Sequence, residues 1–297
     1  MSTETVDTRF VEIDRWPTLL AVEAMLEGQL AAVASLHSQL RNLALASEAA
    51  AERLMLGGRL IYAGAGTSGR IAVQDGVELS PTYGWPEERL IYVLAGGITA
   101  LSQSAEGAED DEEDAVAQLE QVCVGTNDVM IGVAASGRTP FTVSALRYGR
   151  SRGALTIGIS NNPGTPVLEH AEHPLLADTG SELIAGSTRM KAGTAQKAMM
   201  NLFSTATMLR CGLVYRGLMV NMRVSNEKLS NRARDIVKQL TGVDEEAARE
   251  AMAKAGDEIK KAVLLATGID SAQADKLLVD NHQNLRAALD AHANRRS

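Results

Sequence analysis

The chain has 297 residues, of which 45% are hydrophobic and 22% charged, with a formal net charge of −8. This composition is typical of a globular enzyme, and the length suggests two domains of ~150 residues each. Only 3% of the residues are aromatic. Low aromatic content and an acidic balance argue against a nucleic-acid partner, which needs a basic face or stacking platforms. A bound anion would therefore need a local positive field from helix starts and a few basic side chains.

Targeting signals are missing from the sequence pattern. The first residues are acidic and do not form the apolar core of a signal peptide, and no stretch is expected to reach 18 apolar residues. The two cysteines, Cys123 and Cys211, lack C-x-x-C spacing and are expected to be reduced core thiols. These features predict a cytoplasmic protein without a membrane partner.

The first 57 residues read as an arm followed by helices. Residues 2–17 are polar and predict an arm lying over the surface or over a partner subunit. Residues 19–56 carry apolar side chains at steps of three and four, which indicates two helices with a break near Arg41. These helices would either cover the sheet or form a dimer interface. Because twofold pairs are the commonest oligomers, a homodimer is expected.

From residue 58 the pattern alternates between strands and helices. Strands are expected at 59–63, 90–94, 128–134, 154–160 and 174–177, and helices at 69–79, 99–107, 112–122, 139–152 and 165–170. Such alternation predicts an α/β fold, a doubly wound five-stranded parallel sheet flanked by helices. A further helical region at 190–222 is expected in the core. The expected division is 1–57, 58–224 for a phosphosugar-binding domain, and 225–297.

A glycine-rich turn, Gly64-Ala-Gly-Thr-Ser-Gly69, follows the first expected strand and opens a helix. Free backbone N–H groups at such a helix start favour an anion, and two hydroxyls beside them suit a phosphate ester. The same glycine spacing matches a dinucleotide-binding fingerprint, which needs an acidic residue after the next strand. That strand ends in Ala95-Gly-Gly97 without a carboxylate. The turn therefore favours a sugar phosphate over a nicotinamide cofactor.

Similar turns follow two later strands. Ser136-Gly-Arg-Thr139 precedes Pro140, and the segment 178–191 carries further hydroxyl and charged groups. Ser and Thr also cap helices, which would explain any one of these turns alone. Because ligands bind beyond the carboxyl ends of parallel strands, their combination predicts one site. The predicted substrate-binding residues are Gly66, Thr67, Ser68, Ser136, Gly137, Arg138, Thr139, Glu182, Ser187, Thr188 and Lys191.

The C-terminal segment contains an internal repeat, since Thr241-Gly-Val-Asp244 recurs as Thr267-Gly-Ile-Asp270. Each unit reads as a short helical pair that is too small to bury its core alone, so the two should pack as a helical subdomain. This subdomain would serve either as a scaffold or as a lid over the sugar site, with His282 as a candidate contributor.

Two carboxylates near the predicted site are candidates for acid–base chemistry. Glu78 ends the helix that starts on the glycine-rich turn and lies in an apolar context, where desolvation would keep it protonated. Glu109 begins a mostly acidic run that would ordinarily be a solvated surface. The pattern alone leaves the role of Glu109 open.

These motifs together resemble those of the N-acetylmuramic acid 6-phosphate etherases, bacterial enzymes of the sugar isomerase (SIS) fold. The matching stretches are Gly58-Arg-Leu-Ile-Tyr62, Gly64-Ala-Gly-Thr-Ser-Gly-Arg70, Pro81-Thr-Tyr-Gly84, Ala95-Gly-Gly97, Glu106-Gly-Ala-Glu-Asp110, Ala134-Ala-Ser-Gly-Arg-Thr-Pro140, Gly186-Ser-Thr-Arg-Met-Lys-Ala-Gly-Thr-Ala-Gln-Lys197 and Asn226-Glu-Lys-Leu229. The resemblance covers the chain from about residue 13. It implies a lyase that removes D-lactate from C3 of the sugar phosphate, with Glu78 as the acid and Glu109 as the second catalytic carboxylate. It implies no metal and no redox cofactor.

The chain departs from the family pattern in three places. Gly76-Val77 stands where Ala-Ser is frequent, Gln283-Asn284 where Gly-Gly is common, and the N-terminal arm differs from the usual start. Two other functions share the phosphate-binding turns: an aldose–ketose phosphosugar isomerase and a non-catalytic sugar-phosphate sensor like the glucokinase regulatory protein. A sensor would need the turns but not both glutamates.

Overall fold

A computed structural model describes residues 2–103, 105 and 107–294 of the chain. The chain divides into two compact units, Met1–Gly76 with Glu88–Thr207, and Val77–Glu87 with Met208–Ser297. The domain boundaries expected after residues 57 and 224 were drawn from the sequence pattern, whereas the two compact units are defined by contacts between residues. The expected boundaries therefore stay a prediction.

The first unit is built on a five-stranded sheet in the order β2-β1-β3-β4-β5. The strands are β1 (Leu60–Gly64), β2 (Leu90–Leu94), β3 (Val129–Ala134), β4 (Leu155–Ser160) and β5 (His173–Leu176). All neighbouring strands pair in parallel, with Leu60 opposite Leu90 and Val129. Every residue of β1, β3 and β4 is buried, as expected for strands covered on both faces. The predicted α/β fold with a parallel sheet is confirmed.

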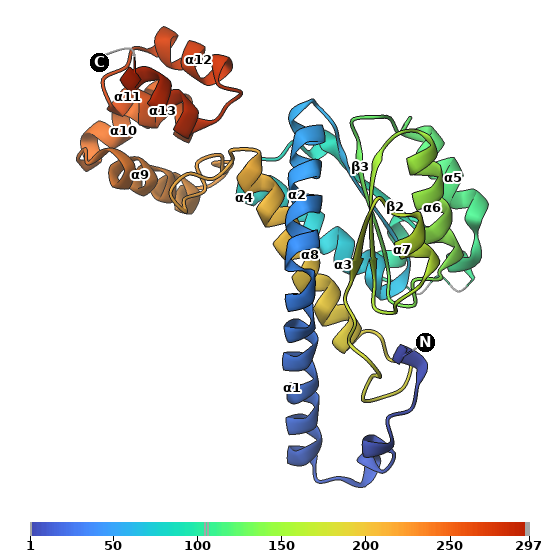
Figure 1. The fold of residues 1–297 in the computed structure, drawn as a ribbon. Helices are drawn as coiled ribbons and strands as arrows, with labels where there is room; N and C mark the ends of the chain where they lie inside the picture. The colour runs from blue at the N-terminus through green and yellow to red at the C-terminus, as the bar shows by residue number, and fades with distance from the viewer. Residues whose placement is uncertain (1, 104, 106, 295–297) are drawn as a thin grey trace. The chain divides into compact units, whose positions relative to one another are not determined.

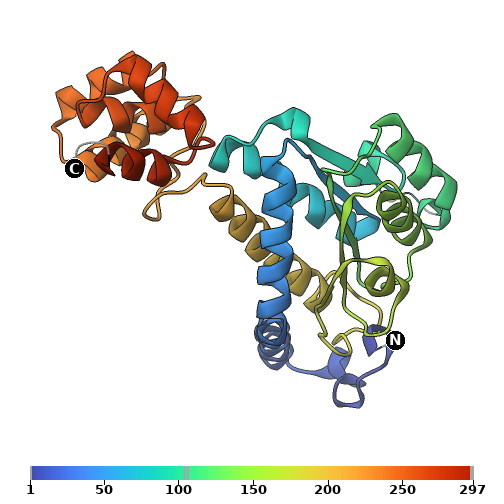
Figure 2. The same ribbon diagram turned by 45° about the horizontal axis from the view of Figure 1, so that its top comes forward.

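Helices cover both faces of this sheet (Figures 1 and 2). One face carries α5 (Glu112–Gln121), α6 (Pro140–Ser151) and α7 (Pro166–His170), and the other carries α2 (Leu40–Met55), α3 (Gly66–Val77) and α8 (Lys191–Arg210). Pro140 and Pro166 each occupy the first turn of their helix, where a missing N–H has no cost. The sheet therefore directs all five of its strand ends toward one edge, where the turns into α3 and α6 meet.

The helix α1 (Thr18–Ala34) is joined to α2 by a 3-10 turn at Ser35–Gln39, slightly before the break predicted near Arg41. Whereas α2 lies along the sheet, α1 extends past its edge (Figure 1). Large apolar side chains of α1 are exposed, namely Leu19, Leu20, Val22, Leu26, Leu30 and Val33. By length and composition the stretch Thr18–Met55 is apolar enough to cross a membrane, although charged residues interrupt it.

Three sequence predictions were wrong in detail. The helix expected at 99–107 is reduced to a 3-10 turn at Ile98–Leu101, with residues 104 and 106 outside the described part. Glycines in the left-handed region lie at the two ends of the segment expected to be helical: Gly97 has a φ of 67° and Gly107 a φ of 76°. The helical region expected at 190–222 ends at Arg210. Cys123 is exposed rather than part of a core, and Cys211 is partly buried.

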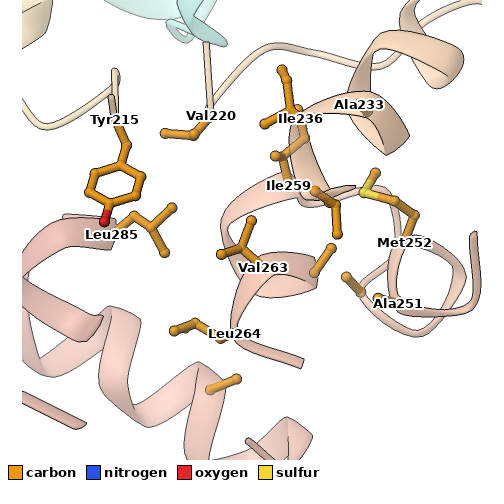
Figure 3. Packing of buried hydrophobic residues seen from close by; sticks show 14 of the residues in the cluster. Tyr215, Val220, Ala233, Ile236, Ala251, Met252, Ile259, Val263, Leu264 and Leu285 are labelled. Carbon is orange, nitrogen blue, oxygen red and sulfur yellow. The ribbon is translucent and has the colours of Figure 1, made fainter. Parts of the chain in front are cut away.

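The second unit contains α4 (Leu79–Tyr83), α9 (Glu227–Thr241), α10 (Glu245–Lys254), α11 (Ile259–Ala266), α12 (Ser271–Asp280) and α13 (Leu285–Asn294). Figure 3 shows how Val263, Ile259, Ile236 and Leu285 converge in its core. The unit therefore has a hydrophobic centre of its own.

The internal repeat is confirmed by matching caps and matching burial. The Asp244 carboxylate accepts from the N–H of Ala247 at 2.8 Å, and the Asp270 carboxylate accepts from that of Gln273 at 2.9 Å. The aligned residues Ala248 and Ala274 are both fully buried. Each repeat therefore supplies one helical pair, α10 with α11 and α12 with α13, to the same core.

Candidate functional site

A pocket of about 420 Å³ lies at the carboxyl edge of the sheet. Seven of the predicted substrate-binding residues line it: Gly66, Thr67, Ser68, Ser136, Arg138, Thr139 and Thr188. They come from the turns after β1 and β3 and from the segment before α8, so residues that are distant in sequence meet here. The pocket is also lined by Glu109, Asp110 and Glu4.

The turn after β1 brings a strand end and a helix start unusually close. A Cβ atom added at Gly69 would lie 3.0 Å from the carbonyl oxygen of Gly64, so a side chain there would crowd the strand. Gly66 has a φ of 52° and begins α3, with Thr67 and Ser68 in the first turn. The free N–H groups of this turn and the two hydroxyls form a cradle suited to a phosphate.

The turn after β3 supplies the second wall. Gly137 has a φ of 66°, and the N–H of Arg138 donates to the Ser136 hydroxyl at 3.2 Å. Thr139 is the N-cap of α6 but makes no side-chain capping bond. Within the described part of the chain, the Arg138 guanidinium has no ion pair. The Thr139 hydroxyl and the Arg138 charge are thus available to a ligand, beyond what helix capping requires.

Glu109 lies on the pocket wall in a short 3-10 turn, Ala108–Asp110, and its side chain is exposed. Gly107, immediately before this turn, has a φ of 76°. The carboxylate of Glu109 thus shares a pocket with both phosphate-suited turns, although the sequence pattern alone resembled a solvated acidic surface. Asp110 beside it was not predicted as a site residue.

Glu182 and Lys191 lie elsewhere. The buried Glu182 carboxylate accepts from the backbone N–H of Lys191 at 3.0 Å and of Ala192 at 2.9 Å, which caps the start of α8. The Lys191 ammonium donates to the carbonyl of Thr179 at 2.8 Å. Both residues line a separate pocket of about 210 Å³ between the N-terminal arm and α1. Glu182 and Lys191 do not line the pocket at the sheet edge. Their binding of substrate stays a prediction, which their hydrogen bonds to the backbone do not support.

Gly137 and Ser187 support the site without being among its lining residues. Gly137 is buried within the turn after β3, and the N–H of Ser187 donates to the carbonyl of Ile184 at 2.9 Å. Ser187 therefore shapes the turn that carries Thr188 to the pocket.

Glu78 belongs to the second compact unit, where it is the N-cap of α4 and is exposed. The desolvated environment expected for Glu78 is therefore not provided by its own unit. Its role as the catalytic acid stays a prediction.

A buried polar cluster fixes the far end of α3. The Tyr62 hydroxyl donates to Asp75 at 3.0 Å, and the Ser204 hydroxyl donates to the other oxygen of the same carboxylate at 3.2 Å. Burial raises the pKa of Asp75, although these hydrogen bonds favour its charged form. The cluster ties α3 to β1 and α8, and so holds the helix whose first turn forms part of the pocket.

No group of three or more His, Cys, Asp or Glu side chains is placed to hold a metal ion among residues 2–103, 105 and 107–294. The polar lining of the pocket consists of hydroxyls, backbone N–H groups, one guanidinium and three carboxylates. Hydroxyls, backbone N–H groups and a guanidinium suit a phosphorylated organic ligand.

Family models match most of the chain. The N-terminal SIS domain of the glucokinase regulatory protein matches residues 42–150, and the SIS domain matches residues 110–206. The C-terminal lid domain of the glucokinase regulatory protein matches residues 216–278. A solved structure from Bacteroides fragilis, a proposed phosphosugar isomerase involved in capsule formation, is similar with a TM-score of 0.53 and 18% identity over 68% of this chain and 95% of that one. The sheet order and these matches define a SIS-domain protein.

Curated relatives are similar over nearly the full length. The N-acetylmuramic acid 6-phosphate etherase of Deinococcus radiodurans is 45% identical over 93% of this chain and 91% of its own length. That of Rubrobacter xylanophilus is 46% identical over 88% of both chains. The chain belongs to the N-acetylmuramic acid 6-phosphate etherase family.

Proposed function

We propose that this protein cleaves the lactyl ether of N-acetylmuramic acid 6-phosphate to give N-acetylglucosamine 6-phosphate and D-lactate. The observation that carries the proposal is the pocket in which Glu109 shares walls with Thr67, Ser68, Ser136 and Thr139, in a chain that belongs to the etherase family. The hydroxyl-lined turns would hold the phosphate. The carboxylates would then move protons at the sugar.

The chemistry needs one base, one acid and water. Opening the sugar ring exposes an aldehyde at C1, which acidifies the proton on C2. A carboxylate removes that proton, the C3–O bond breaks, and the acid protonates the departing ether oxygen as lactate leaves. Water then adds across the resulting alkene, placing a hydroxyl on C3 and a proton on C2. We assign the acid to Glu78 and the second catalytic carboxylate to Glu109.

The acid–base assignment predicts a large loss of activity in Glu78→Gln and in Glu109→Gln, while the sugar phosphate still binds. Because a positioned acid or base contributes ~10²–10⁴-fold, lactate release should fall by that order in each variant. Glu113→Gln is a matched control, since Glu113 is an exposed carboxylate that does not line the pocket. Full activity in Glu78→Gln would remove Glu78 from the acid role.

Turnover in oxygen-labelled water separates the candidate reactions. Elimination followed by hydration places the label at C3 of N-acetylglucosamine 6-phosphate. Interconversion of aldose and ketose phosphates without lactate would identify an isomerase instead. Tight binding of the sugar phosphate without turnover would identify a sensor.

We propose a homodimer in which α1 packs against a second copy. Its support is the exposed apolar row on α1, which includes Leu26 at 58% and Leu30 at 64% exposure. A membrane is the less favoured cover, because the same stretch continues into α2, whose Ser47 hydroxyl contacts the carbonyls of Leu43 and Phe203 inside the folded unit.

We also propose a cytoplasmic location. An exposed free thiol at Cys123 and a phosphorylated substrate support it.

A further inference from the structure

The N-terminal arm reaches the pocket at the sheet edge. Glu4 lines this pocket together with Thr67, Ser136, Thr188 and Glu109. The sequence pattern predicted an arm on the surface and assigned Glu4 no role. Its position beside the proposed phosphate cradle therefore requires an explanation of its own.

The arm is fixed in place by buried contacts. Thr3 is fully buried, and its hydroxyl accepts from the Asn162 amide at 3.0 Å. The same amide donates to the carbonyl of Ala135 at 2.9 Å, in the turn after β3. The N–H of Gly186 donates to the carbonyl of Thr3 at 3.0 Å. The arm is thus held between two turns that build the pocket, and Glu4 follows directly.

The Glu4 carboxylate occupies space that a glycine leaves open. A Cβ atom at Gly186, which has a φ of 74°, would lie 3.0 Å from one carboxylate oxygen of Glu4. In the part of the chain that the structure describes, this carboxylate has neither a hydrogen bond nor an ion pair, and the residue is exposed to the pocket. An anchored arm therefore presents an unpaired acceptor to any ligand in the pocket.

A carboxylate in this position cannot serve the phosphate, since like charges repel and both groups are acceptors. It accepts well from neutral donors, because hydrogen bonds to a charged acceptor are stronger than neutral ones. We infer that Glu4 is a specificity-determining residue that accepts a hydrogen bond from the sugar portion of the phosphorylated ligand. The donor is a hydroxyl or the acetamido N–H. This inference rests on the proposed function, because it assumes that a sugar phosphate is the ligand.

Calorimetric binding tests the inference without requiring turnover. Three probes are titrated into the full chain: N-acetylglucosamine 6-phosphate, 2-deoxyglucose 6-phosphate and inorganic phosphate. Relative to the unchanged protein, Glu4→Ala should weaken the affinity for N-acetylglucosamine 6-phosphate about tenfold, and Glu4→Gln less, because the amide keeps one neutral acceptor. The affinity for inorganic phosphate should stay the same or rise. Glu12→Gln, which removes an exposed carboxylate elsewhere on the arm, should change none of these affinities.

The sugar 2-deoxyglucose 6-phosphate identifies the donor, because it has no hydrogen-bond donor on C2. If Glu4 accepts from the acetamido N–H, Glu4→Ala leaves the affinity for 2-deoxyglucose 6-phosphate unchanged, and if it accepts from a hydroxyl on another carbon, the affinities for both sugar phosphates fall. Tighter binding of every probe in Glu4→Ala would make Glu4 an occluding group and overturn the inference. Unchanged affinities would overturn it as well, as would equal losses for sugar phosphate and inorganic phosphate. If the unchanged protein binds no sugar phosphate, the proposed function fails instead.

Discussion

Asp128 is the residue on which the start of two strands depends. Its carboxylate accepts from the Arg59 guanidinium at 2.6 and 3.0 Å, from the N–H of Arg59 at 3.0 Å and from that of Gly125 at 2.9 Å. Burial opposes its ionisation, but the hydrogen bonds from Arg59 and Gly125 outweigh burial and lower the pKa of Asp128 below its ordinary 3.8. This ion pair joins the residues that precede β1 and β3.

Replacing Asp128 by Asn should lower the free energy of unfolding by about 2 kcal/mol at neutral pH, since charge-assisted hydrogen bonds are lost. A carboxylate with a lowered pKa stabilises the fold fully above its ordinary pKa, and this contribution is lost as the pH falls through the lowered value. The difference between variant and unchanged protein should therefore shrink below pH 3.8. Urea unfolding followed by circular dichroism at several pH values measures it.

Asp75→Asn provides the opposite pH trend as a control. Because burial raises the pKa of Asp75, the ionised carboxylate costs stability as the pH rises through that raised value. The Asn variant lacks this cost, so its stability relative to the unchanged protein should improve with pH. If the stabilities of Asp75→Asn and Asp128→Asn, each relative to the unchanged protein, changed in the same direction with pH, the electrostatic account of both residues would be refuted.

At the scale of elements, the pocket depends on how closely the turn after β3 approaches the end of β4 and the turn that follows it. A Cβ atom at Gly137 would lie 2.2 Å from the Thr165 hydroxyl oxygen and 2.4 Å from that of Ser160. The Ser160 hydroxyl and the carbonyl of Asn162 join the same buried network. The turn after β3 is therefore packed directly on the turn after β4.

Gly137→Ala should lower the free energy of unfolding by about 1–3 kcal/mol and weaken phosphate binding, because the turn must move away from Ser160 and Thr165. Gly164→Ala is a matched control. Gly164 has a similar φ of 60° but nothing within 4 Å of an added Cβ, so it carries the backbone strain alone. Thermal unfolding and phosphate titration compare the two variants. Equal effects in both would show that crowding at Gly137 is unimportant.

At the scale of the whole molecule, α1 leaves apolar surface uncovered by its own chain. Leu26 and Leu30, one helical turn apart, are 58% and 64% exposed. Exposed apolar patches of this kind mark interaction surfaces. The proposed dimer would bury them.

Changing Leu26 and Leu30 together to Glu should convert a dimer into a monomer, because the charges would have to be buried without partners. Light scattering coupled to size-exclusion chromatography measures the mass of each form. Val279→Glu, an equally polar change at a 66% exposed position on α12, should leave the dimer intact. A monomeric unchanged protein at micromolar concentration would contradict the proposal.

The sequence by itself determined the elements whose causes are local. A buried apolar run such as Leu60–Gly64, the glycine turn into α3, and the repeated aspartate caps at Asp244 and Asp270 each depend on neighbours within a few residues. The parallel order of the strands follows from strand–helix alternation, and parallel strands bring Thr67 and Ser136 to one edge of the sheet. Short-range chemistry and the geometry of parallel sheets are sufficient for both features.

Only the tertiary structure decided which polar side chains are free and which are used. The sequence predicted that Glu182 binds substrate, yet its carboxylate caps the start of α8, to which a loop connects it. Glu4 carried no local signal, because its place depends on Thr3 and Asn162, which are far apart in sequence and meet only when the sheet forms. The path of the loop from Glu182 to Lys191 and the contact of Thr3 with Asn162 are both set by tertiary packing, and no periodicity or spacing in the sequence records either of them.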